Sequence, residues 1–364
     1  MRRHIAFGAA FASALAMLTL AAGCGQREAI EPGAAAKLLR SAPIDAALVT
    51  PQFGWVLTED QVLLTTDGGA SFTESKVDLP AGQARAAYFT DAQHGWVAGV
   101  AGQNIIVART ADGGNAWELS KIPTAEPIGS LSVGFGTEAN GGLLAKVQTS
   151  NAFSRGFFFA TADGGKSWNA AGAAPAGGQI AVEPDGRVWL AGGVMADKLY
   201  TSKDQGRNWS EPSLGVTPTA IGLPQGGVLP ATIGDGTSAR VALLTTADAG
   251  ATWHESASVS LQADQGVPAA LAVNGQVVLL ADHAAGRLHR GGKAASAVKS
   301  VGAQGLPAGV SRMTLADQST GWALASSGSC AKNKQSCSIT YTLVATYDAG
   351  DSWRELLSWQ EKVG

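Results

Sequence analysis

One short motif is repeated along this chain and constrains its fold more than any other feature. The pattern is [Ser/Thr]-x-Asp-x-Gly-x-x-[Trp/Phe], and its copies are Thr65–Phe72, Thr110–Trp117, Thr161–Trp168, Ser202–Trp209, Thr246–Trp253 and Thr346–Trp353. Their aspartates are Asp67, Asp112, Asp163, Asp204, Asp248 and Asp348, separated by 45, 51, 41, 44 and 100 residues. The last interval covers about two periods, so the sequence predicts seven units, one of which has lost its motif.

The spacing of apolar runs within a unit predicts the fold class. The motif-free unit is expected near Gly286–Gly292, which lacks both the aspartate and the tryptophan. In the second unit, runs at 85–89, 95–99, 105–109 and 116–119 alternate with turn residues, which indicates four short strands. Four strands in a period of 40 to 50 residues are typical of a propeller blade. We therefore predict an all-β, seven-bladed β-propeller of four-stranded blades.

The motif has a local structural explanation. Glycine adopts the positive φ that a tight turn needs, the aspartate carboxylate accepts backbone hydrogen bonds, and the Ser/Thr hydroxyl joins the same network. The aromatic residue covers the turn and packs against a neighbouring unit. The six aspartates are thus predicted to be structural, and nothing in the motif requires a ligand.

The motif resembles the Asp-box, or bacterial neuraminidase repeat, of sialidases, sortilin-type receptors and photosystem II assembly-factor-like propellers. Gly-Trp steps at Phe53–Val56, His94–Val97 and Thr320–Ala323 precede several boxes and favour the assembly-factor-like group. This resemblance covers about residues 44–364. It implies a seven-bladed, non-catalytic protein without cofactors.

The N-terminal segment has the pattern of an export signal. Arg2 and Arg3 precede an uncharged apolar run, Ile5–Ala22, and small residues stand directly before Cys24. This arrangement resembles a bacterial lipobox, which implies cleavage before Cys24 and lipidation of its thiol. We predict a signal peptide at 1–23, a lipidated tether at 24–43 and the propeller at 44–364, exported and anchored on the extracytoplasmic face. The alternative is a plain transmembrane helix, for which this run is short.

Composition and missing motifs argue against several functions. The formal net charge of −3 shows no basic footprint for nucleic acid. The chain has no Arg-x-Pro sequence and only four tyrosines, so it lacks the signature of a sialidase. The five histidines are scattered, and we predict no metal site. A carboxylate pair for glycoside hydrolysis is not excluded by sequence.

Two sets of residues are candidates for special roles. Cys330 and Cys337 would form a disulfide outside the cytoplasm, the alternative being two free buried thiols. A basic, partner-binding patch is predicted from Arg85, Arg155, Arg240, Arg312, Lys332 and Lys334. The alternative is that these charges are scattered and solvated. The patch hypothesis predicts that charge reversal at Arg85 and Arg312 weakens partner binding without lowering the melting temperature.

The sequence thus favours a monomeric, non-catalytic lipoprotein propeller. Its predicted partner is a protein of a membrane or envelope complex, in whose assembly or maintenance the propeller would act. The alternative is a propeller that binds or cleaves cell-surface glycans.

Overall fold

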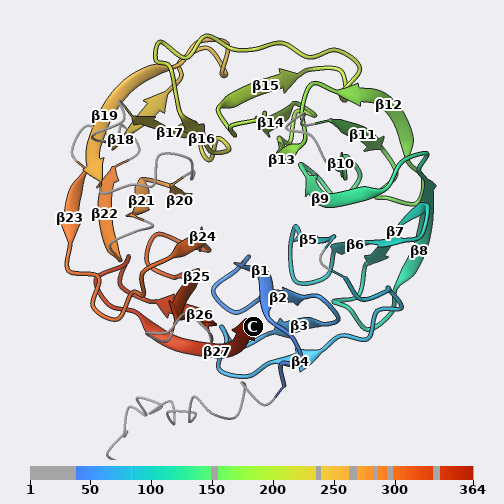
Figure 1. Cartoon of the computed structure of the whole chain (residues 1–364), viewed down its shortest axis with the longest axis horizontal. Coiled ribbons are helices and arrows are strands. Elements are labelled where there is room, and N and C mark those ends of the chain that lie inside the picture. Colours follow the sequence, from blue (N-terminus) through green and yellow to red (C-terminus); the bar gives the residue numbers. More distant parts are fainter. Residues whose placement is uncertain are drawn as a thin grey trace, which may run out of the picture. The chain divides into compact units, whose positions relative to one another are not determined.

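The chain forms a ring of seven β-sheets, each running from the centre to the rim (Figure 1). The computed structural model describes residues 38–82, 84–148, 155–234, 239–261, 269–282, 286–292, 298–330 and 337–363. These belong to one compact unit, Pro32–Gly364. The predicted seven-bladed β-propeller is confirmed.

The strands follow the chain order, and each blade is made from consecutive strands, the first innermost. Blade 1 contains β1 (Pro43–Leu48), β2 (Gly54–Thr58), β3 (Val62–Thr65) and β4 (Thr73–Glu74), and blade 2 contains β5 (Arg85–Phe89), β6 (Gly95–Ala101), β7 (Asn104–Thr110) and β8 (Glu118–Pro123). Blade 3 contains β9 (Ile128–Phe135), β10 (Gly141–Val147), β11 (Gly156–Thr161) and β12 (Asn169–Ala174), and blade 4 contains β13 (Gly178–Val182), β14 (Val188–Gly192) and β15 (Lys198–Ser202). Blade 5 contains β16 (Ala220–Ile221), β17 (Val228–Gly234), β18 (Ala239–Thr245) and β19 (His254–Leu261), and blade 6 contains β20 (Ala270–Asn274), β21 (Val277–Asp282), β22 (Arg287–Gly292) and β23 (Lys299–Val301). Blade 7 contains β24 (Val310–Leu315), β25 (Gly321–Cys330), β26 (Cys337–Thr346) and β27 (Arg354–Val363).

Two blades depart from the common pattern. Blade 4 has three strands rather than the predicted four, and a single antiparallel bridge between Thr201 and Ser210 stands where the fourth would pair. Blade 6 is the predicted unit without a motif, and the Gly286–Gly292 stretch forms its third strand, β22. The sheet therefore forms without a box, because the box builds a turn and not a strand.

The buried apolar residues of the described chain form seven clusters, each lying between two adjacent blades. The ring closes through one of these clusters, without exchange of a strand between the first and last blades. There Phe72 of blade 1 packs against Trp322 of blade 7, with ring centroids 5.9 Å apart. The backbone amide of Leu48 also donates to Thr314 Oγ1 at 3.0 Å. Side-chain packing, rather than a shared sheet, joins the two ends of the ring.

Each box is the turn between the third and fourth strand positions of its blade. In the first box, Thr65 Oγ1 donates to Asp67 Oδ1 at 2.7 Å and accepts the amide of Gly69 at 2.9 Å. Asp67 Oδ1 in turn accepts the amide of Ser71 at 2.9 Å. The other five boxes repeat this network. The box thus satisfies its own backbone polar groups.

Three tryptophans on second strands lie against the second box glycine of the next blade. Trp96 of blade 2 lies against Gly165 in the box of blade 3, and a Cβ on that glycine would meet its indole at 3.0 Å. Trp322, also of a Gly-Trp step, and Trp189, which is not preceded by glycine, lie in the same way against Gly69 and Gly250. These glycines also have positive φ. At these three junctions the tryptophan and the box glycine therefore form one contact between blades.

The first described residues pack on blade 1. Leu39 is buried between blades 7 and 1, and Arg40 forms ion pairs with Asp60 and Glu74 at 3.0 and 2.7 Å. Residues 38–43 fall within the predicted tether, yet they are part of the folded unit. The predicted signal peptide and Cys24 lie outside the described residues. Among the described residues, no helix has the length and hydropathy to cross a membrane.

Candidate functional site

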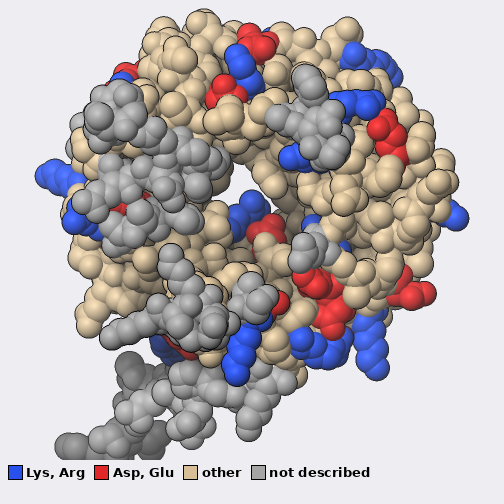
Figure 2. All heavy atoms as spheres, viewed as in Figure 1, with Lys and Arg blue, Asp and Glu red and all other residues tan. Residues whose placement is uncertain are grey.

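The centre of the ring contains a candidate site. A cavity of about 740 Å³ is lined by the inner strands β1, β5, β9, β13 and β24. A second cavity of about 570 Å³ shares Asp45, Ser130, Gln179 and Arg312 with it. Figure 2 shows an opening through the ring at this position, with both basic and acidic atoms at its wall.

The wall of the cavity carries an ion pair. Arg312 Nε lies 3.5 Å from Asp45 Oδ1, which joins the inner strands of blades 7 and 1. Only 29% of the Asp45 side chain is exposed, and this burial raises the pKa of its carboxyl, an effect that the Arg312 guanidinium offsets only in part. The cavity therefore presents the Arg312 guanidinium beside the Asp45 carboxylate, which is poorly solvated because it is partly buried.

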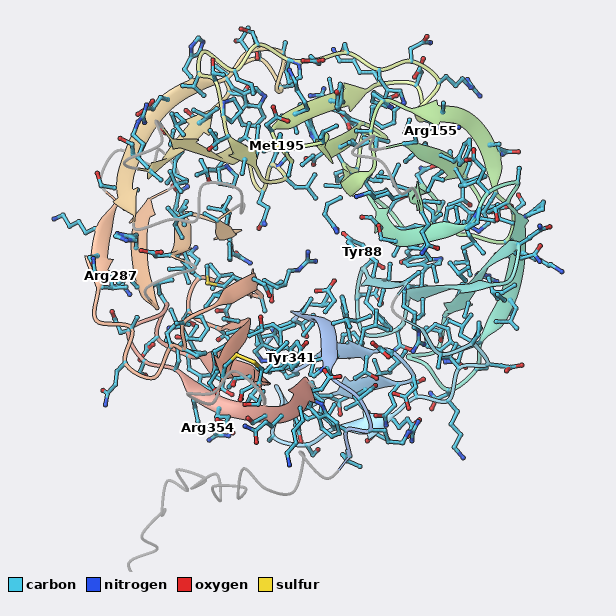
Figure 3. The ribbon with its side chains drawn as sticks, in the orientation of Figure 1. Tyr88, Arg155, Met195, Arg287, Tyr341 and Arg354 are labelled. Atoms are coloured by element: carbon cyan, nitrogen blue, oxygen red, sulfur yellow. A yellow bond between two sulfur atoms is a disulfide. The ribbon has the colours of Figure 1, made fainter. Side chains whose placement is uncertain are left out.

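Tyr88 is the aromatic residue with a polar end in this cavity. It belongs to β5 and lies beside the central opening (Figure 3). Burial raises the pKa of its phenol, the Arg312 guanidinium lowers it, and the Glu183 carboxylate raises it again. The sequence analysis did not select Tyr88, Asp45, Gln179 or Glu183 as site residues. The signal that could have found them is their position on, or directly after, the first strand of a unit, since that strand lines the channel.

Neutral polar groups complete the wall and are fixed by hydrogen bonds. Ser132 Oγ donates to Gln179 Oε1 at 3.2 Å and accepts the amide of Ile180 at 3.0 Å. The two carboxylates among the described lining residues are Asp45 and Glu183, of which Asp45 is engaged by Arg312. The cavity is thus a mixed-charge surface with hydroxyl and amide groups.

Arg85 lies at this cavity but is a buried structural residue. Only 6% of it is exposed, and Nη1 donates to the carbonyl of Thr58 at 3.0 Å, which links blade 2 to blade 1. Burial lowers the pKa of its guanidinium. Reversal of its charge is therefore expected to lower the melting temperature, unlike the expectation from sequence.

The remaining predicted basic residues do not gather with it. Arg155 pairs with Glu126 at 2.9 Å beside blade 3, and Arg240 pairs with Glu255 at 2.6 Å within blade 5 (Figure 3 labels Arg155). Lys332 and Lys334 lie outside the described residues. Of the predicted patch, Arg85 and Arg312 alone line a common cavity among the described residues. Arg155, Arg240 and Arg312 each pair with a neighbouring carboxylate, so the described residues of the predicted patch do not form one basic surface.

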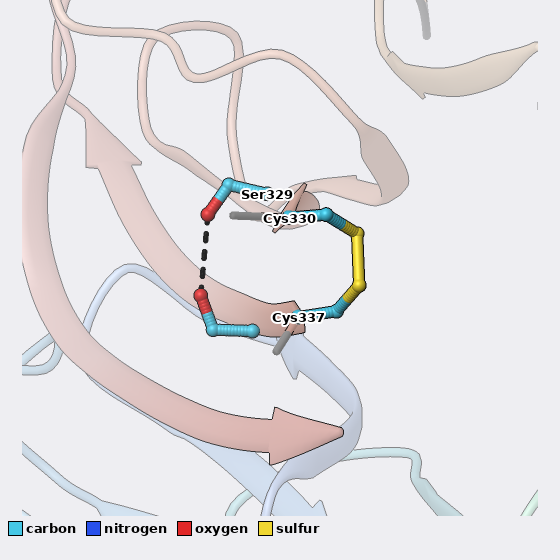
Figure 4. The surroundings of a disulfide bond; sticks show 4 residues. Ser329, Cys330 and Cys337 are labelled. Carbon is cyan, nitrogen blue, oxygen red and sulfur yellow. Dashed lines mark hydrogen bonds between the residues drawn. A yellow bond between two sulfur atoms is a disulfide. The ribbon is translucent and has the colours of Figure 1, made fainter. Parts of the chain in front are cut away.

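Cys330 and Cys337 form a disulfide between the ends of β25 and β26 (Figure 4). Their sulfur atoms are 2.10 Å apart, and Ser329 Oγ lies 3.2 Å from Ser338 Oγ beside the bond. The strands β25, β26 and β27 have 10 residues each. The disulfide therefore pins the tip of the longest hairpin in the described chain.

The box aspartates are acidic because of the networks that hold them. The pKa of Asp204 is lowered to about 2 by hydrogen bonds from the side chain and the amide of Asn208. The pKa of Asp248 is likewise lowered to about 2, chiefly by a hydrogen bond from the backbone amide of Thr252. These carboxylates are saturated with donors and are not available as catalytic bases.

One group of described residues has the geometry to hold a metal ion. Asp91, His94 and Glu138 each place one ligand atom within 4.8 Å of the others. His94 Nδ1 lies 2.9 Å from Asp91 and 3.5 Å from Glu138, and Asp91 also accepts two backbone amides of its own turn. These contacts give the group a structural role at the junction of blades 2 and 3.

Comparison with known proteins supports the resemblance inferred from the boxes. The sequence profile of the family described as "Photosynthesis system II assembly factor YCF48" matches residues 34–182, which cover blades 1–3 and β13. A curated relative, "Photosystem II assembly lipoprotein Ycf48" of Synechococcus sp. (strain CC9902), is 28% identical over 131 residues. That alignment covers 35% of this chain and 36% of the relative, about a third of each protein.

Solved structures share the fold at low identity. The GH74 xyloglucanase of Xanthomonas campestris aligns with a TM-score of 0.54 and 15% identity, over 85% of this chain and 54% of the enzyme. U3-55K aligns with a TM-score of 0.51 and 11% identity, over 77% of this chain and 87% of the other. At such identity these likenesses concern the fold alone. The chain is an Asp-box β-propeller similar to the photosystem II assembly-factor group, and the similarity is carried by its first three blades.

Proposed function

We propose that this protein is a non-catalytic, lipid-anchored propeller that binds a protein partner during assembly or maintenance of a membrane complex. The observation that carries the proposal is the central cavity, whose wall combines the Asp45–Arg312 pair, Tyr88 and fixed amide groups. Protein interfaces are enriched in aromatic residues and arginine and contain direct hydrogen bonds, and this wall presents groups of all three kinds. The similarity of blades 1–3 to a named assembly lipoprotein supports the same role.

The proposed anchor is supported by the sequence around Cys24, which resembles a lipobox. Thirteen residues separate Cys24 from Leu38, a length of chain that spans at most roughly 45 Å. Gln61 Nε2 donates to the carbonyl of Leu38 at 3.0 Å, which fixes the start of the described chain on blade 1. Lipidation at Cys24 would therefore hold the propeller within reach of proteins embedded in the same membrane.

The test is an in-cell cross-linking capture with a C-terminal tag on the lipidated protein. We expect one dominant membrane or envelope protein, whose capture falls with Arg312→Gln, because this variant removes the cation of the cavity. The matched control is Arg155→Gln, which removes an exposed arginine outside the cavity and should leave capture unchanged. Capture unaffected by Arg312→Gln would contradict the cavity as the binding site. Recovery of polysaccharide without an enriched protein would favour the glycan alternative.

A further inference from the structure

Among the described residues, most of the large apolar side chains that are exposed gather on one face of the ring. The exposed set is Leu38, Ile44, Leu119, Val194, Met195 and Tyr347. Exposed apolar side chains that cluster on a surface mark a place where a membrane or another molecule binds. Their distribution over the two faces of the propeller therefore bears on what the ring contacts.

The topology of a blade fixes which of its turns share a face. Neighbouring strands are antiparallel and follow the chain order, with the first strand innermost. The start of the first strand and the turn between the second and third strands therefore lie on one face, and the boxes lie on the other. We call the first the entry face, and it includes residues 38–42 and the turns 59–61, 102–103 and 193–197. The second is the box face.

Four of the six exposed apolar side chains lie on the entry face. Leu38 precedes β1, Ile44 is the second residue of that strand, and Val194 and Met195 lie in the turn 193–197. The other two belong to a box or directly follow one, so they lie toward the box face. The entry face is therefore the more apolar of the two at its exposed positions.

The turn 193–197 presents its two apolar residues at its tip. The amide of Ala196 donates to the carbonyl of Gly193 at 3.3 Å, which leaves Val194 and Met195 at the two central positions. These two residues are 58% and 64% exposed. Turn positions ordinarily hold Gly, Pro, Asn, Asp or Ser, because these residues suit the backbone of a turn. Valine and methionine at a solvent-exposed tip are not explained by the turn itself.

The equivalent described turns of blades 1 and 2 have no apolar tip. Their central residues are Glu59–Asp60 and Gly102–Gln103. The blade 4 turn is also fixed in place, since the carbonyl of Ala196 accepts the amide of Ile221 in blade 5 at 2.8 Å. Blade 4 thus holds an apolar tip in a defined position, where its counterparts hold polar residues or glycine.

The apolar positions of the entry face stand on opposite sides of the central opening. Ile44 belongs to blade 1 and the turn 193–197 to blade 4, and Figure 1 shows β1 and β14 across the ring from one another. Figure 3 labels Met195 in the blade 4 part of the ring. Ile44, Gly193 and Ala196 all line the central cavity of about 570 Å³. Contacts at two such places would hold the face flat against a surface.

The chain enters the propeller on this same face. Gln61, in the turn 59–61, donates to the carbonyl of Leu38, and Asp60 of that turn pairs with Arg40. The segment that leads back to Cys24 therefore leaves the ring from the entry face and has thirteen residues. A lipid on Cys24 would bring this face, and not the box face, toward the bilayer.

We propose that the entry face docks on the lipid bilayer and that Val194 and Met195 insert among the lipid headgroups. Stable membrane attachment commonly combines a lipid chain with a second contact, and the apolar tip supplies that contact. The turn 193–197 contains no lysine or arginine, so a zwitterionic bilayer suffices. The inference rests on the proposed function, because it takes Cys24 to be lipidated. It adds that the central cavity opens toward the membrane, from which a partner must reach it.

The first experiment places one fluorescent probe on each face of the lipidated full chain in phosphatidylcholine vesicles. The chain has three cysteines, two in the disulfide and one at the proposed lipidation site, so an added cysteine can be labelled alone. An NBD group on Met195→Cys should emit at shorter wavelength and be quenched by doxyl-labelled lipid. The matched control is Tyr347→Cys, which replaces an exposed apolar residue of the box face and should show neither effect.

Each outcome of this experiment bears on one claim. If the protein sediments with the vesicles but position 195 is not quenched, or both positions are quenched equally, the docked face is wrong and the anchor stands. Protein that does not sediment with vesicles contradicts the anchor in the proposed function, and the inference falls with it. Shielding of position 195 in cell membranes but not in lipid vesicles would assign the face to a protein and overturn the inference.

The second experiment tests the apolar tip without a label on it. A donor on Gln103→Cys, at the polar tip of blade 2, reports the distance of the entry face from rhodamine-labelled lipid by energy transfer. Combining Val194→Ser with Met195→Ser should lower this transfer, because the face is then held by the tether alone. The control is Leu119→Ser, which removes an exposed apolar residue toward the box face and should leave the transfer unchanged. Equal transfer in all three proteins would refute the inserted tip.

Discussion

The boxes of blades 1–3 and those of blades 4–7 form the same turn from different residues. In the first region, each box has two glycines after its aspartate, and all six have positive φ. In the second region, Gln205, Ala249 and Ala349 take the place of the first glycine while keeping φ at 60°, 54° and 57°. The turn is conserved in shape, but the second region accepts strain that the first avoids.

The two regions also join their blades differently. In the first, the box tryptophan donates to a serine of the preceding blade: Trp117 Nε1 to Ser75 at 3.0 Å, and Trp168 Nε1 to Ser120 at 3.1 Å. In the second, Trp253 donates back to Gly250 of its own box. Backbone bonds replace the lost link, since the amide of Trp253 donates to the carbonyl of Ser213 at 2.8 Å.

Side-chain links demand particular residues, whereas backbone links tolerate many. This difference coincides with the end of the family-profile match at residue 182. Blade 6, which has no box, is joined to blade 7 by a side chain, since Asn274 Nδ2 donates to the carbonyl of Leu315 at 3.1 Å. The comparison teaches that the fold survives loss of the motif where other hydrogen bonds between blades take its place.

The largest effect is expected from the aromatic stack of the first region. Trp96 is 2% exposed, stacks on Phe135 and donates to the carbonyl of Gly164 at 2.8 Å. Trp96→Ala should lower the free energy of unfolding by about 3–5 kcal/mol, because it leaves a cavity and an unsatisfied carbonyl. Trp189→Ala, at the junction of blades 4 and 5, should lower the free energy of unfolding by less, because a cavity of about 350 Å³ already adjoins Trp189. Chemical denaturation of both variants measures the difference, and equal losses would contradict the contrast between regions.

The serine links provide a sharper test. Ser75 is 8% exposed, accepts from Trp117 and donates to the carbonyl of Gly114 at 2.6 Å. Ser75→Ala should cost about 1–3 kcal/mol, because it leaves buried polar groups unpaired. Ser213→Ala should stay within about 0.5 kcal/mol, because its links to blade 5 are backbone bonds. A similar loss in both variants, measured by urea unfolding, would show that the two regions are not joined differently.

Substitution of glycine at the strained box positions should stabilise the protein, unlike the two preceding substitutions. Ala249→Gly and Ala349→Gly should each raise the free energy of unfolding by about 0.5–1 kcal/mol, because glycine adopts positive φ without steric cost. In the first region, Gly113→Ala should destabilise, since its Cβ would lie 2.8 Å from the carbonyl oxygen of Ala92. Differential scanning calorimetry gives the sign of each change. Destabilisation by both alanine-to-glycine variants would contradict the strain.

Acid should lower the stability of the fold in two steps, first through His289 of blade 6 and then through the box aspartates. The box aspartates have pKa values below the ordinary 3.8, with Asp204 and Asp248 at about 2, so their stabilisation is complete above pH 4 and is lost toward pH 2. Burial lowers the pKa of His289 in blade 6 below 6.5, so the fold favours its neutral form. Stability should therefore already begin to fall below pH 6.5. Melting curves between pH 8 and 2 test both steps, and His289→Gln should remove the first alone. A first step that persists in this variant would exclude His289 as its cause.

Local patterns in the sequence were enough to predict the blades and their turns. The box appears as a contiguous motif because its hydrogen bonds join residues at most four positions apart, as from Thr65 to Gly69. The strand prediction for the second unit agrees with β5, which spans Arg85–Phe89. Seven units follow from the spacing of the aspartates, even where blade 6 has lost its own. Short-range hydrogen bonds and apolar alternation are visible in sequence because both depend on neighbours along the chain.

Tertiary structure alone decided which residues meet. The channel wall is assembled from Asp45, Tyr88, Gln179 and Arg312, which come from four blades and share no motif. The sequence predicted Arg85 as part of a partner-binding patch. It is instead buried, because the start of β5 lies against Thr58 of the preceding blade. Such contacts depend on how blades pack around a closed ring, and side-chain direction at those junctions is not encoded in any single repeat.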